Sequence, residues 1–271
     1  MVANGEAIQL LRKAGVPEDQ LVPVAGGERV PLYTREIRQK AKASQVALAV
    51  GGPPGSPPVP DHSLAAVSVH IWPALHCLMP GTNHNDLPDV FDTGKSYTEQ
   101  PSQYFCTLNI TVGMKYGLMR LGDLISPEKM DPGMRSLADF LKDETNVLSA
   151  FDEGQLMYNF LVGDKVLLWN GHLGGYEGIL RLLEPKPDVL VQAVAGRANL
   201  NGRPFNGSAA EFVTEVSRWL SEPERVIWCL CDDSPIKPFS VDTKPATAKL
   251  EKETTSRVVP LQPAEVYEVF E

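Results

Sequence analysis

The order of apolar runs between residues 156 and 230 constrains the fold more than any other feature of the sequence. Two such runs, 156–162 and 165–169, are separated only by Gly163-Asp164, and this spacing predicts a β-hairpin with a two-residue turn. Alternating segments follow: a helix over 175–183, a buried strand over 189–195, a helix over 208–220 and a buried strand over 226–230. This alternation predicts an α/β fold in which helices cover a sheet.

The helix over 208–220 has the clearest signals in the chain. Ser208 and Glu211 have the spacing of a capping box, in which each side chain bonds the backbone N–H of the other residue. Phe212, Val216 and Trp219 then form an apolar stripe at helical spacing. We therefore expect this helix to pack directly on the core.

The first half of the chain and the C-terminus carry weaker signals. Val67, Val69 and Ile71 alternate with polar residues, which predicts a strand over 64–72 that Pro73 ends. Residues 81–150 are expected to be an insertion into a single domain of residues 1–271. The remaining expectations are a helix over 6–14, a strand over 21–24, a loop over 51–60, a strand over 104–112, a helix over 134–142 and an edge strand over 266–270.

Composition excludes several classes of protein. The 271 residues contain 25 Lys and Arg against 34 Asp and Glu, a net charge of −9, which disfavours nucleic-acid binding. No apolar run reaches the ~20 residues that a membrane span requires. The N-terminal residues do not resemble a signal peptide, and 4 Cys are too few for a disulfide scaffold. These features predict a cytoplasmic protein.

Residues able to bind a metal follow three of the predicted strands. His76 follows the strand over 64–72, His172 follows the hairpin, and Cys231 follows the strand over 226–230, with Asp232 and Asp233 next to it. Imidazole, thiolate and carboxylate groups all bind zinc or another divalent metal. The same residues also have plain structural interpretations, because buried Cys often acts as a small apolar residue and Asp pairs occur in solvated turns.

A polar loop between the strand over 189–195 and the following helix is a candidate substrate contact. Arg197, Asn199 and Arg203 lie in this loop, where they could bind a polar or anionic group. A solvated turn explains the same residues equally well, and both interpretations stay open.

Four short motifs resemble the metallo-β-lactamase superfamily, in its lactonase-like and N-acyl-phosphatidylethanolamine phospholipase-like branch. Pro73-Ala74-Leu75-His76 resembles the stretch that supplies a metal-binding histidine, and Pro187-Asp188-Val189-Leu190 resembles a later buried strand. Gly171-His172-Leu173-Gly174 stands where the family has a Gly-Asp motif that bridges two metals, and Cys231-Asp232-Asp233 stands where a final histidine precedes an aspartate. The resemblance implies an αββα sandwich.

Departures from the family pattern change the expected chemistry. The His-x-His-x-Asp-His motif is absent, and His172 replaces the bridging aspartate, so the resemblance implies one metal held by His76, His172 and Cys231. Asp232 or Asp233 would be a further ligand or a proton acceptor, and Arg197, Asn199 and Arg203 would orient a small-molecule substrate. The implied activity is metal-dependent hydrolysis of an ester, lactone, amide or phosphoester through a metal-bound water.

A second function stays open beside the hydrolase. An inactive relative or truncated gene product that serves as a binding or scaffold protein would also lack the principal metal motif. The absent motif leads us to expect an N-terminally incomplete sandwich. An exposed apolar sheet face would then favour poor solubility or a homodimer.

Overall fold

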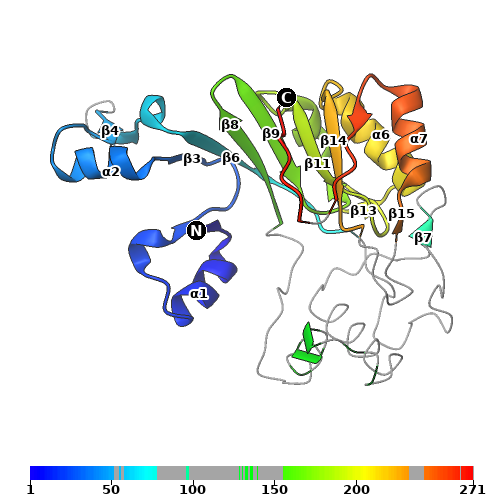
Figure 1. The fold of residues 1–271 in the computed structure, drawn as a ribbon, viewed down its shortest axis with the longest axis horizontal. Helices are drawn as coiled ribbons and strands as arrows, with labels where there is room; N and C mark the ends of the chain where they lie inside the picture. Colours follow the sequence, from blue (N-terminus) through cyan, green and yellow to red (C-terminus); the bar gives the residue numbers. More distant parts are fainter. Residues whose placement is uncertain are drawn as a thin grey trace.

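A mixed sheet of seven strands forms the centre of the molecule (Figure 1). The computed structural model describes residues 1–51, 55, 58–77, 96–97, 128, 130, 132–133, 135–136, 139, 155–231, 241–262 and 264–270. The strand order is β16-β14-β11-β9-β8-β6-β3. These strands are β3 (Arg29–Leu32), β6 (Val67–Pro73), β8 (Leu156–Val162), β9 (Lys165–Asn170), β11 (Val189–Ala193), β14 (Arg225–Cys229) and β16 (Arg257–Val258).

The predicted hairpin is confirmed as β8 and β9. These strands pair antiparallel, and Val162 lies opposite Lys165 across the Gly163-Asp164 turn. From β9 onward the strands β11, β14 and β16 are parallel, whereas β8, β6 and β3 alternate in direction. The sheet is therefore half parallel and half antiparallel, with the hairpin at the change.

Three helices cover one face of the sheet. They are α5 (Glu177–Leu182), α6 (Ala209–Trp219) and α7 (Lys244–Glu253). Leu180, Phe212 and Leu250, one from each helix, are fully buried in one cluster with Leu168 and Leu190 of the sheet. The predicted capping box of α6 is present. The expectation of an α/β fold with helices on a sheet is confirmed.

Two separate segments pack on the opposite face of the sheet. Near the N-terminus, β1 (Val2–Ala3) and β2 (Val22–Pro23) pair around α1 (Gly5–Lys13) and η1 (Glu18–Gln20). Val24 packs there on Val69 and Ile71 of β6. Near the C-terminus, Val269 and Phe270 pack on a cluster that contains Val191 of β11. The two covers lie over different strands, and Trp169 of β9 between them keeps 46% of its surface exposed.

An arm between β3 and β6 projects away from the sheet (Figure 1). It contains α2 (Arg35–Lys42), β4 (Ala49–Val50), β5 (Val59–Pro60) and η2 (His62–Leu64). The Tyr33 hydroxyl donates toward the carbonyl oxygens of Leu48 and Asp61, at 2.9 and 3.0 Å, and thereby ties the arm together. No residue of α2 is buried. The arm is therefore held by hydrogen bonds more than by a core.

The chain leaves and re-enters the sheet at neighbouring positions. Strands β6 and β8 pair antiparallel up to Pro73 and Leu156, although residues 81–150 lie between them in the sequence. Beyond this pair, the Ala74 N–H donates to the Gln155 carbonyl oxygen at 2.8 Å. An insertion requires such adjacent ends, and the insertion itself stays a prediction.

Small sheets and loops complete the described part. The β10 (Gly174–Gly175), β12 (Asn199–Leu200) and β13 (Arg203–Pro204) strands form one small sheet. Strand β7 (Ser96–Tyr97) pairs with β15 (Val241–Asp242). No helix in the described ranges is long and apolar enough to cross a membrane.

Several expectations need correction or stay open. Residues 266–270 form no strand, because Val269 and Phe270 cover the sheet face while β16 forms its edge. Strand β14 ends at Cys229, one residue early, since Leu230 has a left-handed φ of 53°. The predicted strand over 104–112 and most of the predicted helix over 134–142 lie outside the described residues. The αββα sandwich stays a prediction, because the described residues form one large sheet with helices on one face.

Candidate metal centre

Two histidines and a cysteine meet where the central strands end. The potential ligand atoms of His76, Cys77 and His172 all lie within 4.8 Å of one another, and this group could hold a metal ion. The two imidazole rings have centroids 4.2 Å apart and are tilted by 36°. His76 and Cys77 follow β6, and His172 follows β9. The sequence predicted both histidines as ligands, and the fold brings them together.

The backbone fixes the tautomer of His76. Its Nδ1 lies 2.6 Å from the carbonyl oxygen of Cys77, and a carbonyl oxygen can only accept a hydrogen bond. The Nδ1 atom of a neutral ring therefore carries the proton, and Nε2 carries the lone pair. Metal-binding histidines in proteins are commonly oriented by a hydrogen bond of this kind.

His172 is the least satisfied polar group of the cluster. Its Nδ1 atom is buried and has no hydrogen-bond partner among the residues that the structure describes. Burial, followed by the proximity of His76, lowers the pKa of His172 to about 4. The ring is therefore neutral near pH 7. A buried nitrogen without a partner costs free energy, and a metal ion would satisfy it.

The group fits zinc in both donor type and spacing. Two imidazoles and one thiolate are common zinc ligands, and about 3.5 Å separates ligand atoms around tetrahedral zinc with bonds of ~2.0–2.3 Å. The present spread of up to 4.8 Å is wider than that distance by up to about 1.3 Å. Small side-chain rotations would close this difference.

Close backbone contacts hold the two histidine loops together. A Cβ atom on Gly174 would lie 2.4 Å from the carbonyl oxygen of Leu75, so the approach of these loops requires glycine here. Asn199 is fully buried, and its Nδ2 donates to the carbonyl oxygen of His76 at 2.9 Å. These contacts position the segment that carries His76 and Cys77.

A buried amide pair holds the His172 loop. The Nδ2 atom of Asn170 donates to Oε1 of Gln192 at 3.0 Å and to the Gly174 carbonyl oxygen at 3.2 Å. The Nε2 atom of Gln192 donates to the His172 carbonyl oxygen at 3.2 Å. Both amides are buried, so the network ties the start of this loop to β11.

The other predicted site residues occupy different positions. Cys231 lies beyond the end of β14, outside the His76–Cys77–His172 group, and is half-buried against the main core. Asp232 and Asp233 lie outside the described residues. Arg197 donates to the Gly207 carbonyl oxygen at 3.3 Å, and Arg203 is exposed on β13. Their predicted roles toward substrate stay predictions, whereas Asn199 already has a structural role beside His76.

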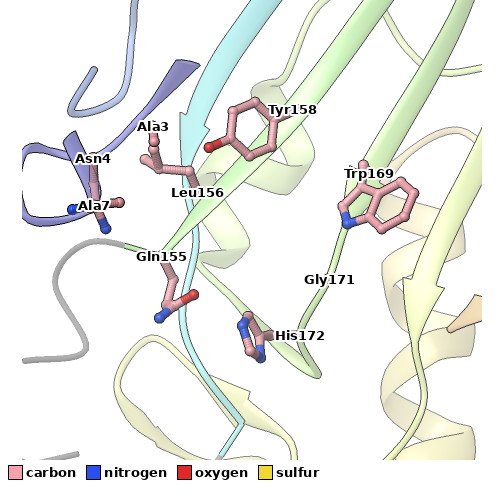
Figure 2. A pocket seen from close by; sticks show the side chains of 9 residues that line it. All are labelled: Ala3, Asn4, Ala7, Gln155, Leu156, Tyr158, Trp169, Gly171 and His172. Atoms are coloured by element: carbon pink, nitrogen blue, oxygen red, sulfur yellow. The ribbon is translucent and has the colours of Figure 1, made fainter. Parts of the chain in front are cut away.

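A pocket of about 240 Å³ opens next to His172 (Figure 2). Strands β8 and β9 supply one wall through Tyr158 and Trp169, which lie opposite each other in the strand register. The N-terminal segment supplies another wall through Ala3 and Ala7. The His172 ring therefore belongs to both the cluster and the pocket. Burial raises the pKa of Tyr158 and keeps its phenol protonated.

Sequence reasoning missed Cys77, Gln192 and the aromatic pair. Gln192 carried a readable signal, because it is the one amide within the apolar run 189–195 and a buried amide needs partners. Tyr158 and Trp169 share one face of the hairpin, but the sequence did not show that this face stays partly open. Cys77 gave no signal beyond its position next to His76.

No family model matches the chain, and no curated protein matches its sequence.

Proposed function

We propose that this protein binds one zinc ion through His76, Cys77 and His172 and hydrolyses an ester, lactone, amide or phosphoester there. One observation carries the proposal: residues from two separate loops bring three metal-binding groups within 4.8 Å. The buried Nδ1 of His172, which has no partner among the described residues, supports it. Three protein ligands are typical of catalytic zinc sites, which keep a fourth position open.

The residues of the cluster have distinct roles in this proposal. When bound, zinc would act as a Lewis acid and lower the pKa of a water ligand toward ~7. The hydrogen bond from Nδ1 of His76 to the Cys77 carbonyl oxygen presents Nε2 as the donor atom. Asn199 and Gln192 hold the backbones of the two histidines through their carbonyl oxygens. Asp232 or Asp233 stays the predicted further ligand or proton acceptor.

The order of elements supports a relation to the metallo-β-lactamase superfamily. His76 follows an antiparallel strand, a hairpin leads to His172, and α6 and β14 lead to Cys231. Pro73, the first residue of the Pro73-to-His76 motif, is the last residue of β6, and His76 follows that strand. We propose on this basis that the sheet and its helices correspond to one half of an αββα sandwich.

Metal content tests the proposal directly. The purified protein is incubated with zinc and dialysed, and its metal is measured by elemental mass spectrometry. We expect about one zinc per chain, and we expect His76→Ala, His172→Ala and Cys77→Ser to weaken zinc affinity by ~100-fold or more, since even outer contacts contribute about 10- to 100-fold. Folding of each variant is checked by circular dichroism.

His62→Ala is the matched control. His62 lies in the arm, and its Nδ1 contacts Ser68 Oγ at 2.9 Å. Its removal should leave the zinc content unchanged. A folded wild-type protein without zinc after this treatment would contradict the metal centre and favour a binding or scaffold protein. Zinc that persists in the His76→Ala and His172→Ala variants would place the metal elsewhere. Cys231→Ser then tests whether that thiol is a ligand.

A further inference from the structure

The pocket beside His172 lies on the sheet face that two of the described segments partly cover. The N-terminal segment covers β6 and β8 around Val69 and Ile71, and the C-terminal segment covers β11 and β14 around Val191 and Ile227. Trp169 lies on β9 between these covers, and 46% of its surface is exposed. An indole exposed to this extent offers a large apolar contact surface to a ligand.

The lining of the pocket has no charged side chain. Leu156, Tyr158 and Trp169 give it an apolar and aromatic part, and Asn4, Gln155 and His172 add neutral polar groups. None of the described lining residues is Lys, Arg, Asp or Glu. In the metal-free protein, a carboxylate or phosphate in this space would lose water without gaining a countercharge from the described lining. The net charge of −9 also disfavours anions over the whole molecule. The pocket therefore selects a neutral group.

The volume of the pocket suits about one ring. A dry protein cavity of about 150 Å³ binds benzene. The present pocket has about 240 Å³, which leaves room for one aromatic ring with a small substituent. Complete drug-sized ligands occupy pockets of roughly 300–1,000 Å³. This space is therefore a subsite for one part of a substrate.

Polar groups at one end of the pocket give the ring an orientation. Gln155 and His172 lie together at that end, whereas Tyr158 and Trp169 form the aromatic wall (Figure 2). A ring that stacks on Trp169 would place a polar substituent beside His172 and thus beside the cluster. Aromatic pairs in proteins contribute about 0.5–1.5 kcal/mol beyond the area they bury.

We propose that this pocket binds an uncharged aryl group, so that the substrate of the hydrolase is a neutral aryl ester or amide. The choice of substrate class rests on the proposed hydrolase function, whereas the binding of an aryl group does not. Trp169 and Tyr158 hold the ring, and Gln155 and His172 orient the group attached to it. The uncharged described lining favours such a neutral group over a phosphoester.

Binding of a non-hydrolysable neutral nitroaromatic tests the proposal without a metal. The full chain is kept in EDTA, and binding of 4-nitroanisole is measured by equilibrium dialysis from its absorbance. We expect saturable binding with one site per chain. The Trp169→Ala variant should bind about 2- to 10-fold more weakly, and Trp169→Phe should recover most of this loss. The anion 4-nitrobenzoate should bind at least about tenfold more weakly than 4-nitroanisole.

Val162→Ala is the matched control for the aromatic wall. Val162 lies four residues after Tyr158 on β8, on the same face of the strand and at the turn end of the hairpin. Its surface is 40% exposed. Its truncation should leave binding unchanged. Equal binding of 4-nitrobenzoate and 4-nitroanisole, or an unchanged affinity in Trp169→Ala, would overturn the proposal.

The outcomes separate this inference from the proposed hydrolase. A protein that binds 4-nitroanisole at Trp169 but never binds zinc keeps the aryl subsite and loses the hydrolase. A protein that binds zinc at His76, Cys77 and His172 but not 4-nitroanisole keeps the metal centre and loses the aryl subsite.

Discussion

Helices α6 and α2 have similar caps but very different surroundings. Helix α6 lies in the body of the protein, by which we mean the central sheet and the helices α5, α6 and α7 that cover it. Phe212 and Val216 of this helix are fully buried. Helix α2 lies in the arm, where no side chain of the helix is buried. The comparison shows that α6 is stabilised mainly by tertiary packing, whereas α2 depends on local interactions such as its cap and the Glu36–Lys40 ion pair.

The largest expected effect is the removal of a core ring from the body. Phe212→Ala deletes a fully buried side chain at the centre of the helix layer. We expect the free energy of unfolding to fall by about 3–5 kcal/mol, because both the burial and the packing are lost. Urea denaturation followed by circular dichroism measures this change.

Ile37→Ala is the matched truncation in the arm. Ile37 is only half-buried on α2, so we expect a loss of at most ~1 kcal/mol. Equal losses in Phe212→Ala and Ile37→Ala would show that arm and body share one core, and would end the distinction between them.

A smaller effect is expected at Gly174, where the body supports the metal cluster. In Gly174→Ala the new Cβ would meet the Leu75 carbonyl oxygen at 2.4 Å, and the segment that carries His76 must shift. We expect a loss of about 1–3 kcal/mol in stability, and a fall of about tenfold or more in zinc affinity. Urea denaturation and zinc titration measure the two changes.

Gly178→Ala is the matched glycine for this test. Apart from its chain neighbours and the backbone of its own helix, no heavy atom lies within 4 Å of a Cβ built on Gly178 in α5, so the substitution meets no obstacle. We expect a gain of about 0.5–1 kcal/mol from improved helix propensity and no change in zinc affinity. A Gly174→Ala protein with normal zinc affinity would mean that the close approach of the two loops does not position His76.

The smallest effects come from the helix caps, and they compare the two regions directly. Ser208 is buried and accepts the Glu211 N–H at 3.2 Å, and Ser208→Ala should lower the global free energy of unfolding by about 1–2 kcal/mol. Thr34 is exposed and accepts the Ile37 N–H at 3.2 Å. Thr34→Ala should change global stability by less than ~0.5 kcal/mol and instead speed hydrogen exchange of the α2 amides. Exchange that also rises across β11 in Thr34→Ala would show that the arm and the body open together.

The body was predictable from the sequence because local and long-range signals agree there. Gly163-Asp164 predicted the hairpin, and the Ser208–Glu211 spacing predicted the start of α6. The arm lacked such agreement. Helix α2 has only Ile37 and Ala41 as apolar residues, and no stripe marks it as a helix on a core.

The site was only partly predictable, because ligand grouping depends on the paths of loops. His76 and His172 could be predicted as ligands because each follows a strand in the sequence. The cysteine that lies beside them in the structure is Cys77 and not Cys231. The left-handed φ at Leu230 redirects the chain before Cys231, and the contact of Gly174 with Leu75 joins the other two loops. Neither feature has a pattern that can be read before the fold is known. The expected strand over 266–270 failed for a similar reason, since apolar residues that cover a sheet resemble those that extend it.

The adjacent ends of β6 and β8 make the chain modular at the site. The hydrogen bond from Ala74 to Gln155 requires only that these two points meet, and it sets no length for the chain that joins them. We expect a replacement of residues 81–150 by a shorter or longer sequence to keep the pairing of β6 with β8, although it would remove β7 and its pairing with β15. Such a replacement would begin a few residues after His76 and end a few residues before Gln155. The junction therefore offers protein engineers a place where new specificity elements can be grafted without redesigning the sheet.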